Sequence, residues 1–85
     1  MELEQLRIFI SVAENRSFSQ AARKLYISHS TTSRAVSALE DELGVRLFER
    51  DNRIFSLTKQ GELLMQEAQE LLERAEEIKN KIKEI

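Results

Sequence analysis

The stretch SFSQAARKLYISHSTTSRAVSAL, residues 17–39, decides the fold of this chain. It predicts two short helices joined by a tight turn. Ser17 is a typical N-cap for the first helix, and Gln20 three residues later completes a capping-box pattern. Ser28 is the matching N-cap for the second helix. Two such helices in succession are typical of a helix-turn-helix motif.

The apolar residues give each of these helices an inward face. The first helix is expected to turn inward Ala21, Ala22 and Leu25. The second is expected to turn inward Thr32, Val36, Leu39 and Leu43. Ile27 should fill the turn between them, and Gly44 is a plausible stop for the second helix. The opposite side of the second helix then presents His29, Ser30, Ser33, Arg34 and Ser37.

Charge is distributed unevenly along the chain. Residues 15–39 contain four basic residues and no acidic residue, although the formal net charge of all 85 residues is −2. Residues 58–85 contain seven acidic and five basic residues, so the acidity lies mostly outside the motif. Because local charge governs recognition more than net charge does, the motif predicts a basic face suited to the major groove of DNA.

Elements on both sides complete a small domain over residues 1–57. Leu3, Leu6, Phe9, Ile10 and Ala13 recur at helical spacing and predict a helix over residues 3–14. A turn is expected after Gly44, at Asp51 and Asn52. It is flanked by a short segment at Leu47 and Phe48 and by a β-prone segment containing Ile54, Phe55 and Leu57. These segments predict a β-hairpin wing. The expected fold is therefore mainly α, a winged helix-turn-helix of three helices and a small hairpin.

The remaining residues, 58–85, predict one long helix with Thr58 as its N-cap. Its apolar residues alternate at spacings of four and three, which is a heptad seam: Leu64, Ala68, Leu71, Ala75, Ile78, Ile82 and Ile85. Because a small head cannot cover so long a seam, we expect a partner helix, most simply from a second copy. The spacing does not distinguish parallel from antiparallel pairing. Gly61 in the first turn is costly for a helix and predicts close packing against the head.

The composition excludes several classes of function. With no cysteine and a single histidine, no thiolate site is possible and a metal site is not expected. No catalytic constellation can be assembled, so we expect neither an enzyme nor a bound cofactor. No apolar run approaches the ~20 residues of a membrane span, and no signal peptide opens the chain. These features predict a soluble, cytoplasmic protein without a membrane partner.

The assembled residues resemble the N-terminal domain of LysR-type transcriptional regulators of bacteria. The resemblance runs through LEQLRIFISVAENRSFSQAARKLYIS (3–28), SRAVSALEDELGVRLFER (33–50) and LTKQGELLM (57–65). It implies regulation of transcription by a dimer that binds double-stranded DNA at an interrupted palindrome. In this family a larger domain usually follows and senses a small-molecule effector. The resemblance therefore implies a DNA-binding fragment without that domain.

The resemblance also assigns contacts. In the family the helix after the turn enters the major groove, the wing enters the flanking minor groove, and the long helices pair, with antiparallel pairing favoured. Carried onto this chain, the major-groove contacts fall on His29, Ser30, Thr31, Ser33, Arg34 and Ser37. The wing contact falls on Arg53, with Arg50 beside it. Family members often have glutamine and proline where His29 and Ser30 stand, and an apolar residue at Thr32.

Other interpretations of these residues stay open. Arg34 can bond a guanine edge or clamp a phosphate, and His29 can simply cap the helix or face water. Arg16, Arg23 and Lys24 can contact phosphates or belong to a solvated face. The acidic run Glu40, Asp41 and Glu42 is expected to be a solvated helix end rather than a carboxylate site. The alternative function is a winged-helix module for protein association without DNA binding.

Overall fold

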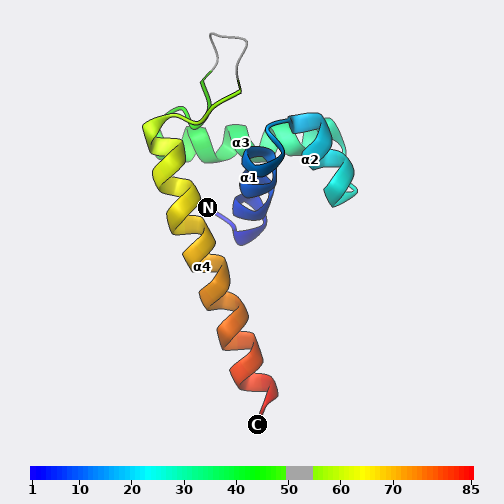
Figure 1. Cartoon of the computed structure of the whole chain (residues 1–85), viewed down its shortest axis with the longest axis vertical. Helices are drawn as coiled ribbons and strands as arrows, with labels where there is room; N and C mark the ends of the chain where they lie inside the picture. The colour runs from blue at the N-terminus through cyan, green and yellow to red at the C-terminus, as the bar shows by residue number, and fades with distance from the viewer. Residues whose placement is uncertain (50–54) are drawn as a thin grey trace.

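The computed structural model describes residues 1–49 and 55–85 and contains four helices (Figure 1). They are α1 (Leu3–Asn15), α2 (Phe18–Leu25), α3 (His29–Leu43) and α4 (Lys59–Lys83). The first three form a head, and α4 runs past it so that its C-terminal half extends alone (Figure 1). The molecule therefore measures 50 × 26 × 20 Å. The mainly α class is confirmed. None of the described helices has the length and apolarity to cross a membrane.

Side-chain caps fix the starts of three helices at the predicted residues. Ser17 Oγ accepts a hydrogen bond from the Gln20 amide at 3.1 Å. Ser28 Oγ accepts one from the Thr31 amide at 3.0 Å, and Thr58 Oγ1 accepts one from the Gly61 amide at 3.0 Å. Each cap satisfies a helix N–H that has no partner within its helix. The three predicted N-caps are thus confirmed.

The ends of the first three helices all use the left-handed backbone conformation. Gly44 ends α3 with φ of 69°, as predicted, and glycine adopts this conformation without steric cost. Arg16 ends α1 with φ of 52° and Tyr26 ends α2 with φ of 57°. A residue with a β-carbon is uncommon there. The tight turns on both sides of α2 are therefore made by Arg16 and Tyr26, two residues with a β-carbon in a conformation that favours glycine.

The core lies where α2, α3 and α4 pack around α1. Its largest fully buried side chains are Phe9, Leu6, Leu39, Leu47, Val12, Val36 and Thr32. The other three phenylalanines of the chain gather around Phe48, whose ring centroid lies 5.4 Å from that of Phe9, 5.7 Å from Phe18 and 5.0 Å from Phe55. This cluster joins α1, α2 and the segments around the wing, so burial of aromatic surface holds the head together.

Two predicted inward positions are wrong. Leu25 and Leu43 are exposed because each is the last residue of its helix and lies outside the core cluster. Leu3 is also exposed, and the buried face of α1 is instead formed by Leu6, Ile8, Phe9, Ser11 and Val12. This buried face is wide because three helices pack on α1.

The base of the predicted hairpin is present. Phe48 and Leu57 form an antiparallel bridge, and the Glu49 amide donates to the Ser56 carbonyl at 3.0 Å. The predicted turn residues Asp51 and Asn52, together with Ile54, lie outside the described residues. This antiparallel pairing places the residues just before α4 beside the segment that follows α3.

Candidate nucleic-acid interface

The start of α3 is built from linked hydroxyl groups. Besides capping the helix, Ser28 Oγ donates to Thr31 Oγ1 at 2.8 Å and lies 3.2 Å from Ser30 Oγ. The Thr32 hydroxyl donates to the Ser28 carbonyl at 3.0 Å and is buried. Thr32 is thus tolerated in place of an apolar residue because its hydroxyl is satisfied within the helix. The first turn of α3 is held in one geometry with short side chains on its surface.

The predicted contact residues of α3 share one accessible side of the helix. His29, Ser30, Thr31, Arg34 and Ser37 are exposed and Ser33 is half-buried, while Thr32, Ala35, Val36 and Leu39 face the core. Across the described ranges, the Arg34 guanidinium has neither a hydrogen-bond partner nor an ion-pair partner. It is therefore available to an external ligand.

His29 makes two contacts at the edge of this face. Its Nδ1 lies 3.5 Å from Ser33 Oγ, and its ring centroid lies 6.2 Å from that of Phe18 at the start of α2. The helix cap is Ser28, so the interpretation of His29 as the cap is wrong. An exposed ring held between α2 and α3 remains accessible to a ligand.

Two more cations lie on the neighbouring helix. Arg23 and Lys24 are exposed in the last turn of α2, where cations favourably face the helix C-terminus. Acidic side chains of α3 lie at its other end, where Glu42 pairs with the amino group of Met1 at 2.8 Å. Hence the surface made by α2 and the first two turns of α3 is basic and has no acidic residue in residues 15–39.

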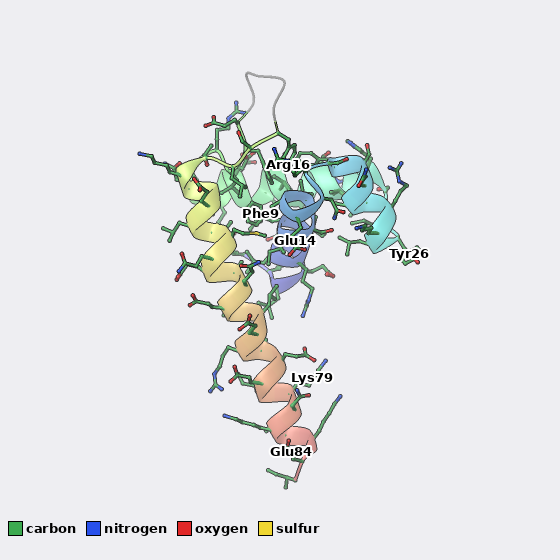
Figure 2. All side chains as sticks on the ribbon, in the orientation of Figure 1. Phe9, Glu14, Arg16, Tyr26, Lys79 and Glu84 are labelled. Carbon is green, nitrogen blue, oxygen red and sulfur yellow. The ribbon has the colours of Figure 1, made fainter. Side chains whose placement is uncertain are left out.

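The guanidinium of Arg16 is hydrogen-bonded within the chain. Its Nη2 donates to the Phe55 carbonyl at 2.7 Å, which links the end of α1 to the returning segment of the hairpin. In Figure 2, Arg16 lies at the end of α1 near the start of α2, and Tyr26 lies at the opposite end of α2, pointing away from the head. The guanidinium of Arg16 therefore supports the base of the wing. The predicted wing contacts Arg50 and Arg53 lie outside the described residues.

Two features of this region do not follow from the sequence patterns. Glu40 is half-buried, and its Oε2 accepts a 2.8 Å hydrogen bond from the Leu47 amide, so its assignment to a solvated helix end is wrong. Its position four residues before Gly44 is the signal that could have identified it, because the chain turns back there. Tyr26 is 95% exposed in the turn of the motif, and nothing in its spacing singles it out.

The predicted seam of α4 is divided between two environments. Ala68 is buried in the same core as Leu6 and Phe9, and Leu64 packs against that core. The prediction that Ala68 faces a partner helix is therefore wrong, because the head of the same chain covers it. The seam residues further along α4 are half-buried or exposed: Leu71, Ala75, Ile78, Ile82 and Ile85. No group of three or more potential metal ligands occurs among the described residues.

Comparison with known proteins agrees with this geometry. Residues 3–62 match the family described as bacterial regulatory helix-turn-helix protein, lysR family. The chain is 42% identical over 82 residues to the HTH-type transcriptional regulator IlvY of Escherichia coli K12, covering 96% of this chain and 28% of that protein. It is 47% identical over 72 residues to ClcR of Pseudomonas putida, covering 85% of this chain and 24% of that regulator.

Solved structures with the same fold include DNA complexes. The complex of the BenM DBD with catB site 1 DNA has a TM-score of 0.94 and 40% identity, covering all of this chain and 94% of that chain. The CbnR DBD–DNA complex has a TM-score of 0.91 and 37% identity, with coverage of 98% and 95%. Full-length BenM also matches, and this chain covers 27% of it.

The matched portion of the longer relatives is their DNA-binding domain, and the chain spans less than a third of the curated relatives' length. Family members are transcriptional regulators, so the family assignment also bears out the expectation that the chain is not an enzyme. A helix-turn-helix head followed by the linker helix α4 reproduces the architecture of the BenM and CbnR domains. The chain therefore belongs to the LysR family of bacterial regulatory helix-turn-helix proteins, as a DNA-binding domain with its linker helix.

Proposed function

We propose that this chain binds DNA sequence-specifically as a homodimer, with α3 of each copy in the major groove of one half of an interrupted palindrome. The observation that carries the proposal is the exposed face of α3, where Arg34 has no partner within the described part of the chain. A planar guanidinium can bond guanine O6 and N7 together, which discriminates bases by about 1–3 kcal/mol. The BenM and CbnR domains, which share this fold, form complexes with DNA, and this supports DNA binding by the present chain.

The small hydroxyl residues of α3 have a complementary role. Ser30, Thr31, Ser33 and Ser37 are short, so the helix can sit deep in the groove and their hydroxyls can reach base edges or phosphates. His29 contributes a ring nitrogen at the edge of this surface. Arg50 and Arg53, which the sequence predicts for the wing, are proposed to contact the flanking minor groove, whose negative potential is strongest in A/T-rich sequence.

The proposed dimer uses the exposed part of the α4 seam. Ile78, Ile82 and Ile85 lie in the half of α4 that has no intramolecular partner among the described residues. Burying the surface that each exposes would stabilise a dimer by at most roughly 1.5–3 kcal/mol per side chain. A second apolar surface lies at the other end of α4, where Leu43, Leu63 and Leu64 line a hollow of about 320 Å³. Antiparallel pairing would bring the exposed end of one α4 toward this hollow of the other copy.

The test is selection of duplexes from a random DNA pool by the 85-residue chain, followed by titration of the enriched sequence. The expected product is an interrupted dyad with half-sites about one helical turn apart or a multiple of it. Arg34→Glu should then abolish binding. The matched control is Arg74→Glu, which makes the same charge change at an exposed position on α4, far from the basic face.

Three outcomes would contradict parts of the proposal. Enrichment of single half-sites would contradict the proposed dimer. Salt-sensitive binding with no enriched sequence would reduce the interaction to the DNA backbone. Equal binding by wild type and Arg34→Glu would remove α3 as the reading element and favour the protein-association alternative.

A further inference from the structure

Both polar groups of the Leu47 backbone are engaged, one by each of two helices. The Leu47 amide donates to Glu40 Oε2 on α3 at 2.8 Å. The Leu47 carbonyl accepts from the amide of Thr58, the N-cap of α4, at 3.0 Å. One residue therefore connects the C-terminal half of the helix that carries Arg34 to the N-cap of the linker helix. The Leu47 side chain is itself fully buried, which fixes this connection in the core.

The first turn of α4 rests directly on the backbone at Arg46 and Leu47. Thr58 Oγ1 donates to the Arg46 carbonyl at 2.6 Å while it accepts from the Gly61 amide. A β-carbon at Gly61 would clash with the Leu47 carbonyl oxygen and lie 3.0 Å from a methyl group of Leu57. The predicted close packing of Gly61 is thus confirmed. Because no side chain separates the two backbones, there is no rotamer that could absorb a tilt of α4.

The length of α4 magnifies any change at this contact. From Gly61 to Ile82 the helix rises about 32 Å at 1.5 Å per residue. A tilt of about 10° at its start would displace Ile82 by about 6 Å, which exceeds the ~3.4 Å rise of one DNA base pair. The angle between α3 and α4 must consequently be held closely if two copies joined through the distal half of α4 are to read half-sites of one spacing.

From this geometry we infer that the junction of Thr58 and Gly61 with Leu47 determines the half-site spacing that the dimer accepts. Thr58 and Gly61 are positioning residues, since they act through α4 and need touch no base. The inference rests on the proposed dimeric DNA binding and deepens it. It assigns spacing specificity to the head–linker junction, apart from the base-reading residues of α3.

The test measures binding of the 85-residue chain to two kinds of duplex by gel-shift titration. One set contains the selected dyad with its spacer lengthened or shortened by single base pairs, and the other contains one isolated half-site. Thr58→Val keeps the side-chain shape and removes the hydroxyl, whereas Thr58→Ser keeps the hydroxyl and is the matched control. Gly61→Ala forces the two backbones apart and tests the same junction independently.

Wild type and Thr58→Ser should prefer the selected spacer over its one-base-pair neighbours by about tenfold. Thr58→Val and Gly61→Ala should reduce this preference at least about threefold or move the optimum by one base pair, with isolated half-site affinity within about twofold of wild type. If Gly61→Ala does not fold, Thr58→Val with its serine control decides the matter.

A uniform loss of affinity on every duplex, including the isolated half-site, would overturn the inference and leave the junction a purely local structural role. An unchanged spacing preference in the variants would overturn it as well. If wild type itself shows no preference for a dyad, the proposed function fails first, and that result is recognised before any variant is compared.

Discussion

The guanidinium of Arg16 donates a 2.7 Å hydrogen bond to the backbone carbonyl of Phe55, 39 residues further along the chain. Arg16 holds this contact from a left-handed backbone conformation, with φ of 52°. The residue thus combines an unfavourable backbone with a favourable long-range bond. These two contributions can be separated by substitution.

Arg16→Gly and Arg16→Ala should differ in stability. Glycine loses the bond to Phe55 but relieves the left-handed backbone, so two effects of about 1 kcal/mol each should nearly cancel. Alanine loses the bond and keeps the unfavourable backbone, so we expect the free energy of unfolding to fall by about 1 kcal/mol. Urea denaturation followed by circular dichroism measures both. Equal stability of the two variants would show that the backbone conformation at residue 16 has no cost.

Substitutions at Ser28 can separate an effect on stability from an effect on DNA affinity. Ser28→Ala removes the N-cap of α3 and should lower the free energy of unfolding by about 1 kcal/mol. Ser28→Asp keeps an acceptor for the Thr31 amide and adds a negative charge at the surface that we propose to face DNA. We expect it to retain near wild-type stability and to bind the selected duplex at least about tenfold more weakly, because like charges repel the phosphates. Wild-type DNA affinity in Ser28→Asp would place the start of α3 away from the DNA.

The role of Arg34 can be tested without changing its charge. Arg34→Lys keeps one positive charge and loses the planar fork, so it should lower discrimination at one base pair in each half-site by about 1–3 kcal/mol. The dependence of affinity on salt should stay the same, since the charge is retained. Titration of wild-type and single-mismatch duplexes at several salt concentrations provides the measurement. A lysine variant with unchanged discrimination would assign Arg34 to a phosphate.

The exposed seam of α4 predicts a concentration-dependent dimer. Ile82→Glu puts a charge in the middle of the proposed interface and should raise the dimer dissociation constant at least about tenfold, because a charge cannot be buried unpaired at low cost. Asn80→Glu introduces the same charge two residues away, off the seam, and should leave the dimer intact. Sedimentation equilibrium distinguishes the three proteins. A monomeric wild type, or equal effects of both substitutions, would rule out pairing through this seam.

Local rules predicted much of the fold correctly. The caps at Ser17, Ser28 and Thr58 depend on residues three apart in the chain, and such short-range hydrogen bonds are visible in a sequence. Gly61 was also identifiable, because glycine within a helix is costly unless another backbone approaches. The basic face followed from the absence of acidic residues over residues 15–39.

Long-range contacts could not be predicted in the same way. Arg16 and Phe55 meet only because the hairpin returns to α1, and Glu40 binds Leu47 only because the chain reverses at Gly44. Apolar residues do follow heptad spacing along α4. That spacing, however, does not show whether a given position packs against a partner helix or against the head of its own chain. Ala68 illustrates this point, since its position in the repeat matches that of Ile82 while its surroundings differ.

Tyr26 stands almost entirely in solvent at the turn that precedes α3. The sequence contains no other tyrosine and no tryptophan, so the intrinsic fluorescence of the protein above the phenylalanine band comes from this one ring. Because the ring is in water already, unfolding should change its emission little. A change in emission on adding a ligand would instead report contact at the turn itself, which gives the helix-turn-helix motif an optical label that requires no chemical modification.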